Sequence, residues 1–360
     1  MPLKAKLDGV WINAALLSEA EWLALRVSRS ILMPCCGKRA YQRRSRLDTR
    51  HFVHSPGSHC GSPGESAEHL AAKAEIVRVC RDLGWDVQSE FAGENWRADI
   101  YATKTRHRIA FEVQWSPQSF EVTRERHSAY GDEVKCCWLF RKLPSPARRP
   151  AKRDPNLAAA EARLPMFELS LSDSGFLVTL DRTRLPLSEF VRARLERRIR
   201  FCANRHYTSR EIQLVTSVVC CWHCGTEYDV FLTRRFLRSE CGVECAEADW
   251  DTYDDDDPCG ARYNWSLLKE HFSSQTQHLR TSVKRRWSNK MKEFYWSFGC
   301  PSCDAIFGAR FFRDVEADAE DSNIALLCSQ QVGCSELDPD AHWCFPQNGK
   351  FCGTSLPARK

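Results

Sequence analysis

Two acids and an amide lie in two short apolar runs, residues 96–100 and 110–114, at a spacing suited to metal chemistry. Side chains alternate between the faces of a strand, so Glu112 and Gln114 would share one face while apolar neighbours take the other. Two carboxylates held close together repel, and a divalent cation between Asp99 and Glu112 would relieve that repulsion. The pattern predicts a magnesium-binding phosphodiesterase centre; a hairpin with ordinary solvated acids is the alternative.

A hairpin would bring the two runs together. Polar residues 104–108 can turn the chain back between them. Ala98 and Ile100 flank Asp99, so we expect its carboxylate, like that of Glu112, to point away from the apolar face. The predicted chemistry therefore depends on the geometry of one strand pair.

A helix must position this hairpin. An apolar stripe predicts a helix over residues 65–83, and Glu65, His69 and Lys73 recur every four residues along one edge of it. Such a row usually borders an amphipathic helix. Here it directly precedes the acids, where a helical acid or histidine could reach a metal-bound water or a phosphate.

Other predicted elements lie on both sides of the hairpin in the chain. The sequence predicts a strand at residues 85–91 before it, and a helix at 116–130 and a buried strand at 135–140 after it. The order helix, strand, hairpin, helix, strand predicts an α/β core with a mixed sheet.

The composition sets broad limits. A chain of 360 residues can form two or three domains with their own cores. Its net charge of +5 does not by itself indicate nucleic acid, although residues 38–50 and 192–200 are basic runs. There is no apolar run of about 18 residues and no signal-peptide core, so we expect a cytoplasmic protein without a membrane partner. Its 19 cysteines are then expected to bind metal rather than form disulfides.

A cysteine–histidine cluster is expected near the N-terminus. Cys36, His54 and Cys60 would bind zinc in a tetrahedral set, and either Cys35 or His51 would complete it. Neighbouring cysteines do not easily bind the same ion, so a cysteine-rich loop without metal is the alternative.

Two Cys-x-x-Cys motifs give the strongest metal signal. They are followed by aromatic runs, residues 228–231 and 306–312, that we expect to be strands. Four thiolates would build a zinc ribbon with no open position, which favours a structural role. The long insertion is tolerable, because each doubling of a loop costs only about 0.6 kcal/mol whereas structural zinc contributes on the order of 10 kcal/mol. The four ligands would be Cys221, Cys224, Cys300 and Cys303.

The remaining segments are less specific. Residues 143–164 are rich in proline and charge and predict a linker, followed by a hairpin over 166–180 and a basic helix over 185–200 that faces either DNA or solvent. Residues 249–257 predict an acidic solvated loop rather than a metal site, and the basic, aromatic residues 284–292 either contact a nucleic-acid strand or pack as a helix. Near His342 the tail carries cysteines whose spacing predicts no particular site, namely Cys328, Cys334, Cys344 and Cys352.

In combination these stretches resemble the PD-(D/E)xK nuclease superfamily and, more narrowly, the competence-protein CoiA family. The resemblance covers roughly residues 1–142 and extends toward residues 185–201. The stretches that carry it are Met33-Pro34-Cys35-Cys36-Gly37, His51-Phe52-Val53-His54, Glu65-Ser66-Ala67-Glu68-His69 with Lys73, Arg97-Ala98-Asp99-Ile100, Phe111-Glu112-Val113-Gln114 with Ser116, and Arg126 with Tyr130.

The resemblance implies a restriction-endonuclease-like fold, a mixed sheet flanked by helices, and divalent-metal-dependent cleavage of DNA. It implies that Asp99 and Glu112 bind Mg²⁺ or Mn²⁺, helped by the Val113 carbonyl oxygen. Glu68 or His69 would be the contribution of the helix.

The resemblance also raises a question about the water-orienting group. Gln114 stands where the superfamily has a lysine, in the E-x-Q form of this family. An amide can hold water but carries no positive charge. Either Lys73 supplies the charge, or activity is weak, or the site binds without cutting. Arg126 and Tyr130 are candidate substrate contacts, although Arg126 could equally pair with an acid.

The sequence thus predicts a Cys/His module (residues 1–62), a nuclease core (63–142), a linker, hairpin and basic helix (143–210), and a zinc-ribbon region with an insertion and a cysteine-rich tail (211–360). The expected function is metal-dependent hydrolysis of foreign, incoming, branched or single-stranded DNA, with a protein partner at the C-terminal region. The alternatives are a catalytically silent nucleic-acid-binding or scaffold protein, and a zinc-ribbon interaction module.

Overall fold

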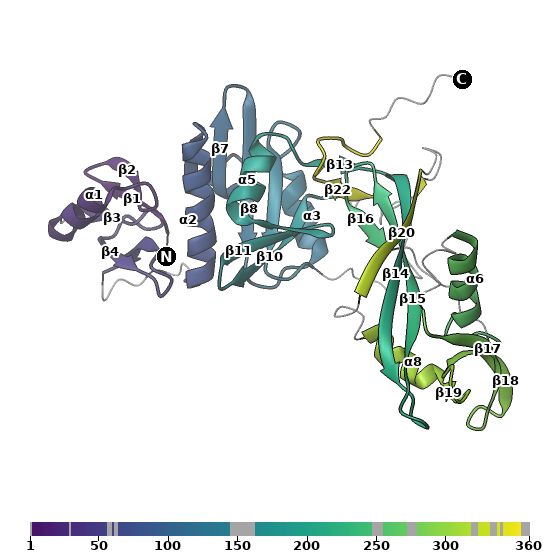
Figure 1. Ribbon diagram of the computed structural model, residues 1–360. Coiled ribbons are helices and arrows are strands. Elements are labelled where there is room, and N and C mark those ends of the chain that lie inside the picture. The colour runs from purple at the N-terminus through teal and green to yellow at the C-terminus, as the bar shows by residue number, and fades with distance from the viewer. Residues whose placement is uncertain are drawn as a thin grey trace, which may run out of the picture. The chain divides into compact units, whose positions relative to one another are not determined.

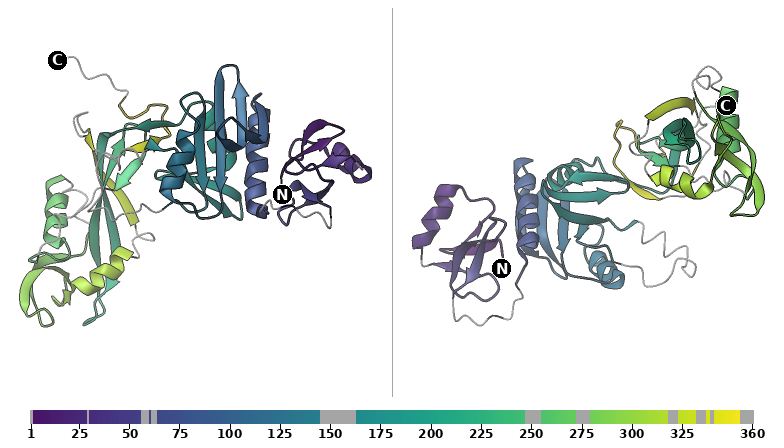
Figure 2. Two further views of the ribbon diagram at one scale, coloured as in Figure 1. Left: turned by 180° about the vertical axis from the view of Figure 1, so that it is seen from behind. Right: turned by 60° about the horizontal axis from the view of Figure 1, so that its bottom comes forward.

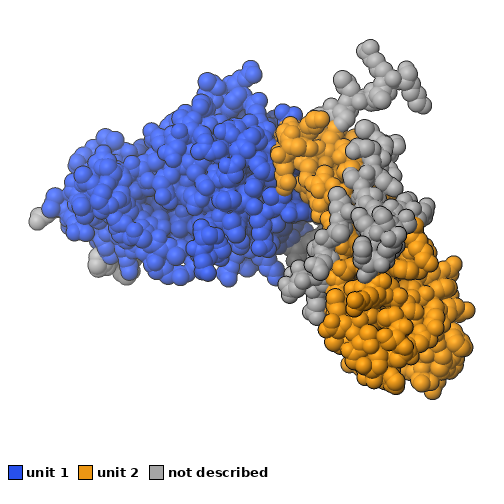
Figure 3. Space-filling model, viewed as in Figure 1, with its two compact units in different colours: residues 1–203, 341–345 blue, residues 204–340, 346–360 orange. Residues whose placement is uncertain are grey.

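Packing divides the chain into two compact units, residues 1–203 with 341–345 and residues 204–340 with 346–360 (Figure 3). The structure is a computed structural model that describes residues 2–28, 30–55, 60, 64–144, 163–246, 255–271, 279–317, 323–331, 337–338 and 341–353. Most of the expected linker, the acidic residues 249–254 and Cys334 lie outside the described residues. None of the helices in the described part is long and apolar enough to cross a membrane.

The first unit begins with a small module that has its own core. Trp22 and Phe52 pack in that core with their ring centroids 5.8 Å apart. One three-stranded sheet and one hairpin surround them. The elements are β1 (Lys4–Leu7), β2 (Val10–Asn13), α1 (Glu19–Ala24) continued by η1 (Leu25–Val27), β3 (Ile31–Leu32), β4 (Ala40–Arg44) and β5 (Arg50–His54).

A seven-stranded mixed sheet forms the body of the first unit. Its order is β12-β11-β10-β9-β8-β7-β6, with β8, β9 and β10 parallel and the other neighbours antiparallel. The predicted mixed α/β architecture is therefore confirmed. The strands are β6 (Asp86–Ala92), β7 (Arg97–Lys104), β8 (His107–Gln114), β9 (Lys135–Phe140), β10 (Met166–Ser172), β11 (Gly175–Leu180) and β12 (Thr183–Pro186).

Helices cover both faces of this sheet. On one face α2 (Ala67–Asp82) and α5 (Leu187–Leu195) pack against each other and against buried strand residues, and α2 lies beside the sheet in every view (Figures 1 and 2). The Ser66 side chain accepts a hydrogen bond from the His69 N–H and so fixes where α2 begins. On the other face Tyr130, just beyond α3 (Phe120–Ser128), packs with Trp138.

The regular alternation of side chains between the two faces of the sheet breaks at Asp99 of β7. Ala98 packs with Tyr130 and Trp138, whereas Ile100 packs on the α2 side of the sheet. Opposite Asp99, Glu90 of β6 has φ +49, a conformation that interrupts regular pleating. The expectation that Ala98 and Ile100 would share one apolar face is thus wrong, and the regular pairing of β7 with β8 also ends at Ile100.

The second unit is built on a long antiparallel pair, β14 (Arg205–Cys220) with β15 (Glu227–Ser239). Its other elements are β16 (Glu244–Ala246), α6 (Ala261–His271), β17 (Ser282–Ser288), β18 (Glu293–Gly299), β19 (Ile306–Phe307), α8 (Ala309–Ala317), β20 (Asn323–Gln331) and β21 (Leu337–Asp338). In the first unit, β13 (Arg200–Cys202) pairs with β22 (His342–Cys344).

Two expectations for this unit need correction. The run 306–312 is a strand only at residues 306–307 and continues as a helix from Ala309, because Phe312 packs into the core from one helical face. Residues 284–287 form a strand rather than a helix, since β17 pairs along its whole length with β18.

Candidate active site

Asp99 is held by three groups from two elements. The Val113 N–H of β8 donates to Asp99 Oδ2 at 2.9 Å, and His69 Nε2 of α2 lies 3.4 Å from the same oxygen. Lys73 Nζ lies 3.4 Å from Asp99 Oδ1. Burial alone would raise the pKa of Asp99, but the Lys73 charge and these hydrogen bonds hold it well below its usual range. Asp99 is therefore a carboxylate at neutral pH.

Lys73 is enclosed by acids. Its side chain is fully buried, and Nζ lies 2.7 Å from Glu65 Oε1 and 2.8 Å from Glu90 Oε1, in addition to Asp99. Burial favours the neutral amine, yet the three carboxylates raise the pKa of Lys73 well above its usual value. Lys73 is thus a permanent internal cation, and it faces carboxylates rather than solvent.

The charges of this cluster do not balance. Three carboxylates surround one ammonium, and the second oxygens of Glu65 and Glu90 are buried without a hydrogen-bond partner among the described residues. A ligand atom from each of Glu65, His69 and Asp99 lies within 4.8 Å of the others. Surplus negative charge, unpaired oxygens and converging ligands are what a divalent cation requires, so these residues fit one.

Glu112 lies on the opposite side of β8, toward α3. Its buried carboxylate accepts a hydrogen bond from Arg126 Nη2 at 2.9 Å and one from the Tyr130 hydroxyl. Arg126 in turn donates to Gln118 Oε1 at 2.8 Å and stacks over the Trp138 ring at 4.7 Å. Arg126 and Tyr130, predicted to contact substrate, therefore hold the second acid.

The charge of Glu112 is sensitive to its surroundings. Burial, followed by the negative charge of Asp99, raises the pKa of Glu112 to about 7 although Arg126 and Tyr130 oppose the shift. Asp99 is thus close enough to influence it. In the described part of the chain, however, the group of ligand atoms within 4.8 Å consists of Glu65, His69 and Asp99 and does not extend to Glu112.

The other predicted residues lie at the border of the site. Gln114 Nε2 donates to the Ser116 carbonyl oxygen at 3.0 Å. Glu68, on the first turn of α2, forms an ion pair with Arg46. Neither of them contacts the Lys73 cluster through a described hydrogen bond.

An open groove of about 350 Å³ adjoins Glu68 at the carboxyl ends of the three parallel strands. Trp115 directly follows β8, Arg141 directly follows β9, and residues 169–171 of β10 complete the lining. This edge of an α/β sheet is where such folds commonly bind ligands. An aromatic ring and a guanidinium suit a base and a phosphate respectively.

Sequence reasoning missed three of these residues. Trp115 and Arg141 could have been found because each is the first residue after a predicted strand. Glu90 had no such signal, since its approach to Lys73 depends on contact between β6 and α2 rather than on local pattern.

The two Cys-x-x-Cys motifs come together in the second unit. Cys221 Sγ lies 3.5 Å from Cys303 Sγ, and Cys224 Sγ lies 3.5 Å from Cys300 Sγ. All four sulfurs lie within 4.8 Å of one another. This cysteine cluster can hold a zinc ion by the chemistry of its ligands.

Comparison with known families agrees with this geometry. Residues 65–149 match the family model described as competence protein CoiA, nuclease-like domain. The matched segment contains α2, the β7–β8 pair, α3 and β9, and hence the acids described above. The match indicates a nuclease-like domain and supports a relationship to the CoiA family. Among curated proteins, none matches the chain.

Proposed function

We propose that this protein is a divalent-metal-dependent nuclease that hydrolyses DNA phosphodiester bonds at the site beneath α2. The observation that carries the proposal is the convergence of Glu65, His69 and Asp99 around surplus negative charge. This convergence lies within the segment that matches a nuclease-like domain.

The ligands suggest which ions the site accepts. Two carboxylates suit Mg²⁺ and Mn²⁺, and an imidazole is better tolerated by Mn²⁺ than by Mg²⁺. When bound, the ion would lower the pKa of a water molecule and neutralise charge on the scissile phosphate. Glu65, His69 and Asp99 would bind this ion. Glu112 is the other acid of the β7–β8 hairpin.

The remaining residues take separate roles. Lys73 holds three carboxylates in place, because its ammonium group is buried among them. Gln114 is the better candidate to orient water, since its amide oxygen can accept a hydrogen bond while its N–H group bonds Ser116. Arg126 and Tyr130 position Glu112.

DNA would enter through the groove beside Glu68. The Arg141 guanidinium, which could bind a phosphate, lies over the Trp115 ring at 5.9 Å, and a base that stacks on this ring would have to share it with Arg141. A catalytically silent nucleic-acid-binding protein is the second candidate, because Glu112 is engaged by Arg126 and Gln114 lacks a positive charge.

The test is cleavage by the purified full-length protein. Single- and double-stranded DNA are incubated with Mg²⁺ and then with Mn²⁺, and products are separated by electrophoresis. We expect metal-dependent cleavage that Asp99→Asn reduces by about 10²–10³-fold, the effect of losing a group that stabilises charge in a transition state. Asp86→Asn, which changes an exposed acid on β6, is the matched control and should cleave normally.

The opposite results separate the candidates. Cleavage that survives Asp99→Asn rejects this site. DNA binding in gel shifts without any cleavage, in either metal, favours the silent binding protein instead.

We also propose that the cysteine cluster binds structural zinc, because four thiolates leave no open coordination position. Metal analysis of the intact protein should find zinc, and replacement of Cys221 by serine should lower its amount.

A further inference from the structure

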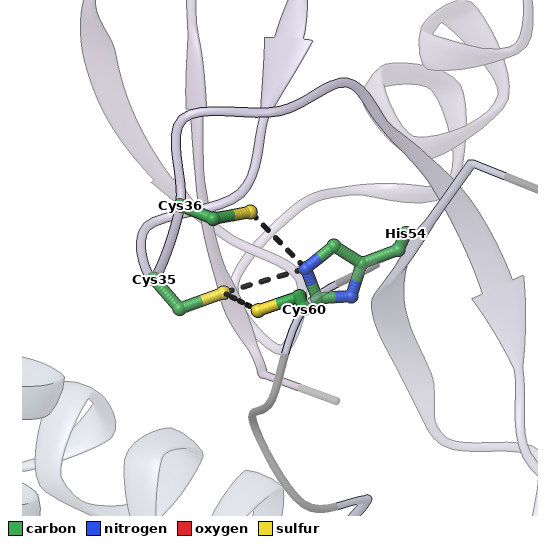
Figure 4. Close-up of side chains that lie close together, drawn as sticks. All are labelled: Cys35, Cys36, His54 and Cys60. Carbon is green, nitrogen blue, oxygen red and sulfur yellow. Dashed lines mark hydrogen bonds between the residues drawn. The ribbon is translucent and has the colours of Figure 1, made fainter. Parts of the chain in front are cut away.

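We propose that the N-terminal module binds its own structural zinc ion through Cys35, Cys36, His54 and Cys60. Cys35 and Cys36 lie on the turn before β4, His54 ends β5, and Cys60 lies beyond it. Figure 4 shows the four side chains pointing toward a common centre, and their ligand atoms all lie within 4.8 Å of one another. The proposal does not depend on the nuclease activity.

The distances match a tetrahedral ion. With zinc–sulfur bonds of about 2.3 Å and zinc–nitrogen bonds of about 2.0 Å, a regular tetrahedron separates two sulfurs by about 3.8 Å and a sulfur from a nitrogen by about 3.5 Å. Cys35 Sγ lies 3.7 Å from Cys60 Sγ, and His54 Nε2 lies 3.4 Å from Cys35 Sγ and 3.3 Å from Cys36 Sγ. These separations leave room for an ion at the centre.

The turn that carries Cys35 and Cys36 repeats the turns of the cysteine cluster. In each turn the first N–H donates to the sixth carbonyl oxygen, and the fifth N–H donates to the first carbonyl oxygen. The fifth residue of each has a positive φ. The three turns span residues 33–38, 221–226 and 300–305. A backbone shape used twice for thiolate pairs therefore recurs here.

The N-terminal turn differs in its first residue. In the other two turns the first and fourth residues are both cysteines, whereas here they are Met33 and Cys36. Met33 is 2% exposed and packs in the core of the module. The core thus occupies the first ligand position, and the thiol of Cys35, the third residue of the turn, supplies the missing ligand. Adjacent cysteines can both bind in this way.

The geometry favours Cys35 over His51 as the fourth ligand. His51 and His54 are three residues apart on β5, so they point to opposite faces of the strand. The His51 ring is buried, and its Nδ1 lies 3.1 Å from the Thr49 carbonyl oxygen. His51 is therefore directed into the module, away from the sulfurs.

An ion at this position would strengthen a weak part of the fold. The β4–β5 hairpin forms a separate two-stranded sheet, and such pairs are marginal on their own. Four ligands would join the turn, the end of β5 and Cys60.

The test is the zinc content of the full-length protein. Zinc per chain is measured by atomic emission for the wild type and for Cys35→Ser, Cys36→Ser and Cys60→Ser. Each substitution should lower the content by one zinc per chain. Cys220→Ser, an exposed cysteine that also precedes another cysteine, and His51→Gln should retain the wild-type content.

Ligand exchange distinguishes binding from folding. His54→Ala should lose the ion, whereas His54→Cys should retain it and, after exchange with Co²⁺, gain thiolate-to-cobalt absorption for one additional sulfur. Unchanged zinc in both Cys36→Ser and Cys60→Ser overturns the proposal, and loss in His51→Gln but not in Cys35→Ser overturns the ligand set. A Cys35–Cys60 disulfide, detected by mass in the purified protein, would also overturn it.

Discussion

The site beneath α2 and the cysteine cluster of the second unit both bring ligand atoms within 4.8 Å of one another. The ligands differ in kind: two carboxylates and an imidazole in the first, four thiols in the second. Beneath α2, carboxylates already surround an internal cation, Lys73, and two of their buried oxygens still have no hydrogen-bond partner within the described part of the chain. In the cysteine cluster, four thiolates can complete a tetrahedron. In the roles proposed for them, ligand type and charge balance would separate a centre that exchanges an ion and admits substrate from one that only joins chain segments.

Removing zinc from the cysteine cluster should produce the largest effect. Cys221→Ser takes away one of four ligands, and structural zinc contributes on the order of 10 kcal/mol to folding. We expect the second unit to unfold at a much lower temperature, as measured by calorimetry. DNA cleavage at the site beneath α2 should persist. Complete loss of cleavage in a variant whose first unit remains folded would break the proposed separation of roles.

Replacing Lys73 tests the charge balance of the site beneath α2. Lys73→Met leaves Glu65, Glu90 and Asp99 without their shared cation, and breaking a buried ion pair typically costs about 3–5 kcal/mol. The expected result is a lower free energy of unfolding in urea. Added Mg²⁺ should stabilise Lys73→Met more than the wild type, because in the variant Mg²⁺ replaces the missing ammonium charge among the carboxylates.

The exposed Lys135, on β9, is the matched control for this experiment. Lys135→Met should behave like the wild type in both respects. Equal Mg²⁺ stabilisation of Lys73→Met and the wild type would contradict the idea that this cluster binds a divalent cation.

Glu112 should make stability depend on pH. Its pKa is raised to about 7 from an ordinary value of 4.5, so the folded protein favours the protonated acid. The resulting stability is fully present below about pH 4.5 and is lost as pH rises toward 7, by up to ~3 kcal/mol. Glu112→Gln should remove this decline. Urea denaturation at pH 5 and pH 8, without divalent metal, measures it.

Asp99 does not interfere with that measurement. Because its pKa is lowered, its contribution is present above its ordinary value of 3.8 and is lost only at more acidic pH. A decline that persists unchanged in Glu112→Gln would assign the titration to another group.

The sequence predicted elements better than it predicted directions of side chains. Strand β9 has the predicted bounds, 135–140, because a continuous apolar run between turn signals needs no distant information. The α2 stripe was equally local. Asp99 could not be oriented in advance, since its carboxylate is held by groups from β8 and α2 that no local pattern places beside it. The role of Lys73 likewise required β6 and β7 to be placed against the helix.

The same limit explains the errors in the second unit. The aromatic residues 306–312 predict a strand, but the chain is helical from Ala309 on, and Phe312 packs into the core from this helix. By contrast, the cysteine cluster was predictable because Cys-x-x-Cys spacing records ligand chemistry directly. Thiolate metal sites are therefore easier to predict from a single sequence than carboxylate metal sites.

Gln114 should give the smallest effect and so marks the edge of the carboxylate site. Gln114→Ala removes one neutral group that could orient water, and a single such hydrogen bond is worth about 1 kcal/mol. We expect kcat for DNA cleavage to fall by about fivefold to tenfold with KM unchanged, and the exposed Gln88→Ala to have no effect. A loss as large as that of Asp99→Asn would instead place Gln114 among the groups that bind the metal. No loss at all would show that Gln114 does not orient the water, and Lys73 could not take its place, because Lys73 is surrounded by carboxylates and has no exposed surface.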